Sequence, residues 1–321
     1  MFFSIGLGGI VLGVCCLLLI TGVRIYRIRK GLDFSLPEEV HTVFIGPSTI
    51  QAAIADQLLD GAVNLGRSGT NYVALTPALE KILKENSQID TVYIAHGVFM
   101  MMTYSNKDIK KLSLQYVQSS FPFYCLAPWE DYQQIFLKNI NYYGTLLNPS
   151  WRDFFSGGGY TLVGLNFGHE PSYCNHVHNL YNDEVDWSIA WREKKFTDEG
   201  SNRYQYSLDY IEENYSINLS HINRAIELCK EYQVLPILFC PPLFENERWM
   251  DYTGYYDYMS KLDPSLLIAD YEKFQFPSDE YYQDLYHCNS WGADYLSTDI
   301  ATKGMNLQTL GEWCASKKSI R

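Results

Sequence analysis

His41-Thr-Val-Phe-Ile-Gly-Pro-Ser-Thr-Ile50 is the stretch of sequence that decides the fold. The apolar run at 42–45 is typical of a short buried strand, and Gly46-Pro47-Ser48 is a turn signal. Apolar residues then recur at helical spacing from Ile50 onward. The segment therefore predicts a strand, a turn and a helix in succession, which is the repeating unit of a parallel sheet.

The same alternation recurs along the chain and predicts an α/β fold with a doubly wound parallel sheet. Further strands are expected at 62–65, 91–95, 234–239 and 266–270, with helices between them, including one over 72–85. A helix around 293–300 is expected to close the domain, and the basic tail from Lys317 is expected to be solvated. No internal repeat is evident.

Between about 98 and 205 the alternation stops, and the chain is rich in Tyr, Trp, Phe, Asn and Gly. We interpret this stretch as a large insertion within a single domain that spans 31–321. It would be either a lid that covers the substrate or a subdomain packed against the sheet. The spacing of Cys174, His176 and His178 favours a surface loop over a zinc site, so no metal is predicted.

The N-terminal segment 2–23 carries no charged side chain and is long enough to cross a membrane. It predicts one transmembrane helix, because the run exceeds the apolar part of a signal peptide and lacks a basic region before it. Residues 1–30 would then form an anchor with a basic flank. Because Arg24, Arg27, Arg29 and Lys30 follow the apolar run, the positive-inside rule places the next domain in the cytoplasm.

Composition excludes several classes of protein. Of the 321 residues, 47% are hydrophobic and 19% are charged, which excludes a mainly disordered chain. With 25 basic and 37 acidic residues the net charge is −12, so nucleic acid is not expected as a partner. The eight cysteines show no C-x-x-C pair, and they predict neither a disulfide framework nor a zinc module.

Candidate catalytic residues lie where the predicted strands end, since the loops at the carboxyl edge of a parallel sheet converge on one crevice. Ser48 follows the first strand, Gly66 the second, and Asp284 with His287 the last. Serine needs a neighbouring base, and the base needs a third group that fixes its tautomer. Ser48, His287 and Asp284 could supply these roles, with the N–H groups of Ser48 and Gly66 as oxyanion donors.

Each of these residues also has a structural explanation. Ser48 with Gln51 three residues later fits a capping box, in which the serine side chain would cap the helix. Asp284 and His287 would be a structural pair near a helix start, and Gly66 a turn glycine. His96 is interpreted as a structural histidine.

The run Asp284-Leu-Tyr-His-Cys-Asn-Ser-Trp-Gly-Ala293 resembles the D-x-x-H-x-N-x-x-G-A ending found in the SGNH, or GDSL-like, hydrolase and acyltransferase superfamily. It looks most like membrane-anchored members that O-acylate cell-envelope polymers, of the D-alanyl transfer protein and alginate O-acetylation protein type. The resemblance covers about half the chain and implies a three-layer α/β/α fold. It also implies Ser48 as nucleophile, His287 as base, Asp284 as its orienting group and Gly66 as an oxyanion donor.

Two departures from the family pattern bear on the oxyanion hole. The family's G-D-S is replaced by Gly46-Pro47-Ser48, which keeps the Ser48 N–H. The asparagine that normally follows the third strand is missing, since the sequence reads Ala95-His96-Gly97. Gly97, His96 or Asn71 could replace that donor, whose loss typically costs about 10²–10³ in turnover.

The resemblance implies a membrane-anchored, serine-dependent O-acyltransferase or esterase that acts on a cell-surface polysaccharide or glycolipid. Such a protein needs no cofactor, faces away from the cytoplasm and accepts acyl groups from an integral-membrane partner. The basic flank after the apolar segment favours the opposite side of the membrane. The alternative function is an inactive binding or assembly protein that keeps the sheet but has lost turnover.

Overall fold

The computed structural model describes the sheet, most of its helices and the loops that carry the candidate residues. The described residues are 34–67, 70–97, 105–111, 126–131, 133, 204–205, 207–244, 250–251, 253–284, 286–318 and scattered positions between 12 and 26. Most of the predicted membrane segment 2–23, and Cys174, His176 and His178, lie outside them. Within the described part, no helix is both long and apolar enough to span a bilayer.

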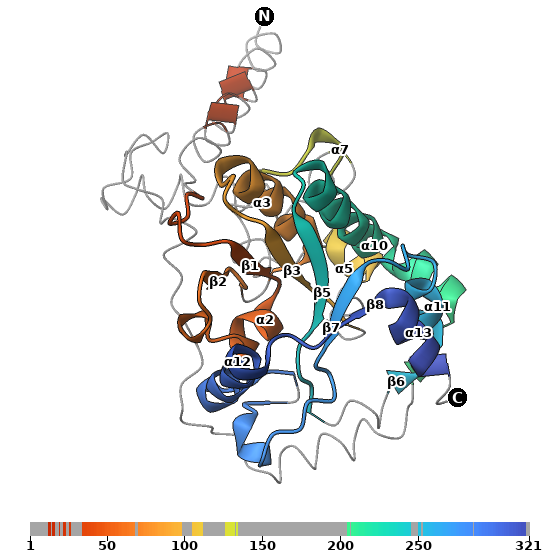
Figure 1. Cartoon of the computed structure of the whole chain (residues 1–321). Coiled ribbons are helices and arrows are strands. Elements are labelled where there is room, and N and C mark those ends of the chain that lie inside the picture. The colour runs from red at the N-terminus through yellow and green to blue at the C-terminus, as the bar shows by residue number, and fades with distance from the viewer. Residues whose placement is uncertain are drawn as a thin grey trace, which may run out of the picture.

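A six-stranded sheet with the strand order β2-β1-β3-β5-β7-β8 forms the centre of the fold (Figure 1). Its strands are β1 (Thr42–Ile45), β2 (Ala62–Asn64), β3 (Thr91–Ala95), β5 (Leu235–Cys240), β7 (Leu267–Asp270) and β8 (Leu307–Thr309). The first five run parallel, and β8 is antiparallel to β7. The sheet is therefore mixed but mostly parallel, and the expectation of an all-parallel sheet was wrong at this one edge.

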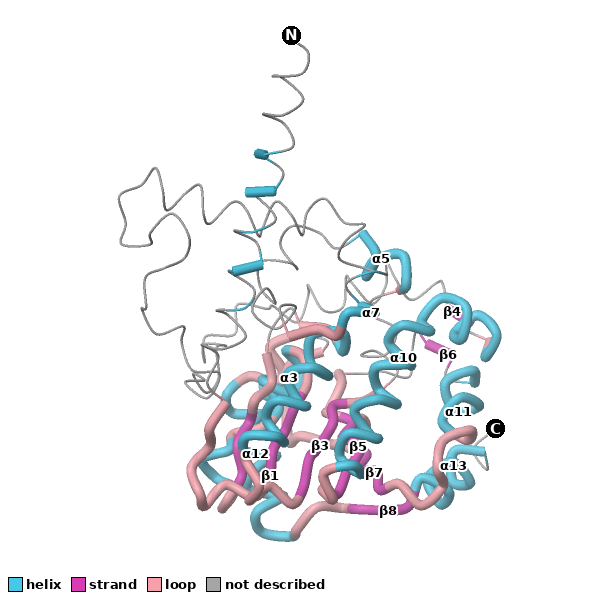
Figure 2. The backbone as a smooth tube through the Cα atoms, turned by 90° about the horizontal axis from the view of Figure 1, so that it is seen from above, coloured by secondary structure: helices cyan, strands magenta, loops and turns pink. Residues whose placement is uncertain are grey.

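Helices follow the strands as the alternation predicts. They are α2 (Ser48–Ala53), η1 (Asp56–Leu58), α3 (Tyr72–Glu85), α10 (Leu208–Glu231), α11 (Thr253–Met259), η4 (Asp279–Tyr281), α12 (Ser290–Lys303) and α13 (Leu310–Lys318). Helix α3 packs along α10, and α12 packs on α2 and η1 (Figures 1 and 2). Right-handed connections between parallel strands place these two pairs on opposite faces of the sheet.

Three short elements lie within or at the end of the predicted insertion, namely α5 (Asn106–Lys111), α7 (Trp129–Asp131) and β4 (Tyr204–Gln205). A fourth, β6 (Met250–Asp251), lies further along the chain and pairs with β4 outside the main sheet. Asn106 links α5 to α10, because its side-chain amide donates to the Glu213 carbonyl oxygen over 2.7 Å. Helix α5 thus contacts α10.

Aromatic side chains on three adjacent strands fill the middle of the core. The Phe44 and Tyr93 rings stack with centroids 4.5 Å apart, as expected for residues opposite each other in register on β1 and β3. Phe239 on β5 meets Phe44 edge-on at 5.7 Å. Because all three side chains are buried, they fix how β1, β3 and β5 lie together and so where each strand ends.

The start of the C-terminal segment 317–321 is part of the fold, contrary to the expectation of a solvated tail, whereas 319–321 lie outside the described residues. Lys317 on α13 places its Nζ 2.8 Å from Asp270 Oδ2, and its side chain is only 11% exposed. The Trp313 indole N–H donates to the same carboxylate oxygen over 2.7 Å. Burial by itself lowers the pKa of Lys317, but the charge of Asp270 outweighs it and leaves that pKa above its ordinary value. Helix α13 is thereby tied to the end of β7.

Candidate functional site

Ser48 is the first residue of α2, directly after the turn that follows β1. Pro47 takes the N-cap position of this helix, and no side chain caps it. The capping-box explanation for Ser48 was therefore wrong: the serine lies inside the helix, and its hydroxyl is turned to another partner. Its backbone N–H belongs to the first helical turn, where N–H groups have no intrahelical acceptor.

The partner of the Ser48 hydroxyl is His287. Ser48 Oγ lies 2.8 Å from His287 Nε2. On the other side of the ring, Nδ1 lies 2.8 Å from both carboxylate oxygens of Asp284. Since residues 48 and 287 come from opposite ends of the domain, this contact exists only in the folded chain. The structure thus brings Ser48, His287 and Asp284 into one hydrogen-bonded line.

Asp284 is held in its charged form by its surroundings. Burial by itself raises the pKa of this carboxyl group, but hydrogen bonds from His287 outweigh it and hold the pKa below its ordinary value. The backbone N–H groups of Tyr286 and His287 also donate to Oδ1, over 2.8 and 2.9 Å. A carboxylate can only accept, so Nδ1 of His287 carries the proton and the Nε2 lone pair faces the Ser48 hydroxyl.

Asn289 fixes the loop that carries His287. Its Oδ1 accepts from the Gly292 N–H over 3.0 Å and so caps α12, while its Nδ2 donates to the Glu280 carbonyl oxygen over 2.6 Å. Its own N–H donates to the carbonyl oxygen of Tyr281. A Cβ on Gly292 would lie 2.3 Å from that same Tyr281 oxygen. The Asn and Gly of the D-x-x-H-x-N-x-x-G pattern therefore serve to place the histidine.

Helix α12 is also tied to the segment that carries Ser48. The buried Ser297 hydroxyl on α12 accepts a hydrogen bond of 2.8 Å from the Ala55 N–H, just beyond the end of α2. The helix after the histidine and the helix that begins with the serine thus form one packed unit (Figure 1). This packing sets the distance between the Ser48 hydroxyl and the His287 ring.

Gly66 does not present a free oxyanion donor. Its N–H donates to Asn64 Oδ1 over 2.9 Å, so the expected role of Gly66 is not supported by this arrangement. The glycine is needed for another reason, since a Cβ here would lie 2.3 Å from Ile50 Cγ2 and 2.6 Å from the Gln51 nitrogen. Gly66 is a site of close approach between the β2 loop and α2.

Asn64, which sequence reasoning missed, organises this corner of the site. Its side-chain Nδ2 donates to the carbonyl oxygens of Ile50 and Ile54 over 3.1 and 2.8 Å, and so completes the last turn of α2. Its backbone N–H donates to Asp56 Oδ2 over 2.7 Å. The sequence does offer one signal for Asn64: it is a polar residue at the end of a strand, two positions before a glycine.

The remaining donor candidates differ in position. Asn71 caps α3 through its Oδ1, which accepts from the Ala74 N–H, and its role as an oxyanion donor stays a prediction. Gly97 has a left-handed φ of +139°, and a Cβ on it would lie 2.8 Å from a carboxyl oxygen of Glu272. A carboxyl group at that position does not favour an oxyanion next to Gly97.

His96 is completely buried, in line with its interpretation as a structural histidine. Its Nε2 lies 2.9 Å from the Met259 sulfur, and its ring packs at a tilt against Tyr255 with centroids 5.7 Å apart. Burial lowers the pKa of His96 to about 4, so the ring is neutral at physiological pH.

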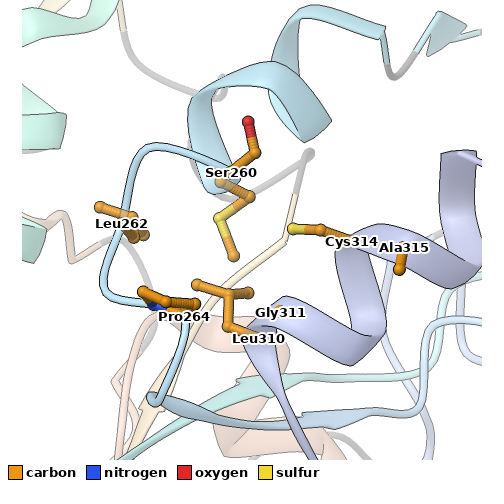
Figure 3. A pocket seen from close by; sticks show the side chains of 8 residues that line it. Ser260, Leu262, Pro264, Leu310, Gly311, Cys314 and Ala315 are labelled. Carbon is orange, nitrogen blue, oxygen red and sulfur yellow. The ribbon is translucent and has the colours of Figure 1, made fainter.

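An apolar pocket of about 260 Å³ lies elsewhere on the domain (Figure 3). It opens between the end of α11 and the start of α13, and Leu262, Pro264, Leu310 and Cys314 line it. This is the β7–β8 end of the sheet, three strands away from β1. No histidine or carboxylate lines this pocket, so it offers no general base.

Comparison with protein-family models, with curated proteins and with solved structures finds no match for this chain.

Proposed function

We propose that this chain is a serine-dependent esterase or O-acyltransferase of the SGNH type. The observation that supports it is the line of hydrogen bonds from Ser48 Oγ through His287 to Asp284. This arrangement is the one that activates a serine hydroxyl, whose oxygen is otherwise a weak nucleophile at neutral pH. A purely structural histidine would not need its lone pair directed at a serine hydroxyl at the open end of a sheet.

In the proposed reaction the Ser48 oxygen attacks the carbonyl carbon of an ester while His287 Nε2 takes the hydroxyl proton. The oxyanion that forms is stabilised by the Ser48 N–H. His287 then returns the proton to the leaving alcohol as the ester bond breaks, which leaves the acyl group on Ser48. A second hydroxyl, from water or from an acceptor, gives its proton to His287 and attacks the acyl carbon, and His287 passes that proton to the Ser48 oxygen as the acyl–serine bond breaks.

The proposed setting comes from the sequence resemblance. The acyl acceptor would be a cell-surface polysaccharide or glycolipid, segment 2–23 would anchor the domain in a membrane, and an integral-membrane protein would deliver the acyl group. On this proposal the catalytic domain lies outside the cytoplasm, and the basic residues after position 23 oppose that orientation.

One observation favours a second candidate, an inactive binding or assembly protein. Because the Gly66 N–H is engaged by Asn64, and the usual asparagine after β3 is missing, fewer donors stand ready for an oxyanion than in the family pattern. Removal of a single donor costs about 10²–10³ in turnover, so the loss of two could reduce the rate to near the background. The two candidate functions differ in whether the protein catalyses acyl transfer or hydrolysis.

A mutant set with an aryl acetate substrate tests the proposal. We expect Ser48→Ala, His287→Ala and the double variant to share one residual rate, at least ~10³-fold below the parent, because triad residues act as a unit and their effects do not add. Asp284→Asn keeps an oxygen acceptor but loses the charge, and should fall by about 10²–10⁴. The controls are Ser260→Ala and His41→Ala, which change exposed residues away from the triad. Equal rates in parent and variants would favour the inactive scaffold.

A further inference from the structure

A groove of about 460 Å³ runs along α12, beginning four residues beyond His287. Its lining side chains are Tyr281, Trp291, Asp294, Tyr295, Thr298 and Asp299, with Thr302 at the far end. Except for Tyr281, these residues lie on α12, where each is three or four positions from another member of the set, so they share one face of the helix. The groove is therefore a surface of the same helix that positions the catalytic histidine.

Aromatic rings give this groove flat, rigid walls. Trp291 is 51% exposed and Tyr295 is 40% exposed, although both are large side chains. Tyr281 stacks on Phe276 with centroids 5.5 Å apart and an interplanar angle of 3°, and it meets Tyr295 edge-on at 5.4 Å. Because these neighbours already fix the tyrosine rings, a ligand that stacks on them would order few side chains.

Oxygen atoms alternate with the rings along the same face. Asp294 and Asp299 bring carboxylates to the groove, and Thr298 lies between them. Asp299 is already oriented, since its Oδ1 lies 2.5 Å from Lys303 Nζ. The groove thus combines apolar faces with hydrogen-bond acceptors at short intervals.

This combination selects among possible ligands. A sugar ring has one face of C–H groups, which stacks on an aromatic ring, and an edge of hydroxyl groups, which donate to carboxylates. The two carboxylates disfavour a polyanionic ligand, and an apolar helix would bring no hydrogen-bond donors to them. A saccharide that is neutral or carries amino groups satisfies both the rings and the acids.

We propose that the α12 groove binds a neutral or amino-bearing saccharide chain as the acceptor of acyl transfer, an inference that rests on the function proposed above. The groove is joined to the triad by the backbone: the Asn289 N–H donates to the carbonyl oxygen of Tyr281, which lines the groove. A chain stacked on Trp291 would thus lie on the first turn of the helix that begins three residues after His287. Its hydroxyl groups would supply the acceptor for the acyl group on Ser48.

The test is glycan binding by the full-length Ser48→Ala protein, kept in a detergent without a sugar headgroup. A glycan array with neutral, amino-bearing and anionic saccharides gives the specificity, and titration calorimetry with the best soluble oligosaccharide gives the Kd. We expect neutral or amino sugars to bind, and Trp291→Ala to weaken binding at least tenfold. The matched control is Trp129→Ala, which removes another exposed tryptophan, on α7 and outside the groove; its Kd should equal that of the parent.

Several results would overturn the inference. These are no binding to any glycan, a preference for anionic glycans, or binding that Trp291→Ala leaves unchanged. Self-association or binding to phosphatidylcholine vesicles that depends on Trp291 would assign the groove to another partner. Because the Ser48→Ala protein cannot form an acyl-enzyme, its glycan binding is independent of turnover. If the parent is active but its Ser48→Ala form binds no glycan, only the proposal for the groove is wrong. If the parent is inactive, acyl transfer is wrong as well, and with it the role of the glycan as acceptor.

Discussion

At the scale of single residues, burial and hydrogen bonding give His287 and His96 different chemistry. His287 keeps contact with both Ser48 and Asp284, and its side chain is 16% exposed. His96 is fully buried beside a sulfur atom, and its pKa falls to about 4. The same residue type, directly after β3 for His96 and in the loop before α12 for His287, thus becomes a neutral packing element in one place and a candidate base in the other.

His96 should make the fold sensitive to mild acid. In the unfolded chain its pKa is about 6.5, so between pH 6.5 and 4 the unfolded state binds a proton that the folded state does not. The contribution of neutral His96 to the free energy of unfolding is therefore fully present above pH 6.5. It is lost as the pH falls towards 4, by roughly 3 kcal/mol in total. Urea unfolding at pH 7.5 and pH 4.5 measures the loss. The pKa of Asp284 lies below its ordinary 3.8, so this carboxyl group affects the pH dependence of stability only at lower pH.

The substitution His96→Gln isolates this contribution, because glutamine does not titrate. We expect the difference in unfolding free energy between the two pH values to shrink by roughly 2–3 kcal/mol in that variant, whatever its absolute stability. His41→Gln, at an exposed site, should keep the parental difference. An unchanged difference in His96→Gln would show that His96 is not the buried titrating group.

At the scale of elements, the site depends on how α12 is seated. Asn289 caps this helix and holds the η4 segment, and Ser297 joins it to the end of α2. The distance between Ser48 and His287 is therefore set mainly by how α2 and α12 pack together. The loops that precede these two helices have less influence on it. A shift of about 1 Å in this packing is enough to reduce catalysis strongly.

Gly292→Ala is expected to produce such a shift. Its new Cβ would lie 2.3 Å from the Tyr281 oxygen and 2.9 Å from Cys288 Cβ, so α12 must move away from the η4 segment. We expect a loss of roughly 1–3 kcal/mol in unfolding free energy and a lower kcat for the aryl acetate.

The matched control is Gly311→Ala on α13, where the nearest atom, Pro264 Cβ, is 3.3 Å away. This variant should keep the parental rate and change stability less than Gly292→Ala does, because Pro264 needs to move by only a few tenths of an ångström. If Gly292→Ala were as stable and as active as the parent, the seating of α12 would not control the site.

At the scale of the whole molecule, local sequence predicted the parallel part of the sheet well. The helix expected over 72–85 coincides with α3, and the strands expected at 42–45 and 91–95 coincide with β1 and β3. Each is a buried segment with clear periodicity and a turn signal after it, so local sequence and tertiary burial agree. Strand β8 is only three residues long and carries no such pattern, and its place at the sheet edge is set by pairing with β7.

The candidate site was predictable where chemistry and spacing coincide. Asp284 and His287 are three residues apart, and the strand-end position of Ser48 made their meeting an expectation that the structure bears out as geometry. The sequence could not show that Asn64 binds the Gly66 N–H, because this contact depends on how the β2 loop folds onto α2. Competition of this kind between a neighbouring side chain and a substrate is visible only in three dimensions.

The most direct measurement is labelling of the full-length protein with a fluorophosphonate probe, followed by mass spectrometry to locate the adduct. We predict one adduct, on Ser48, that is lost in both Ser48→Ala and His287→Ala, because the probe reacts only with a serine activated by its base. A folded protein that takes up no probe, or labelling of Ser48 that survives His287→Ala, would contradict the claim that these residues form a working nucleophile.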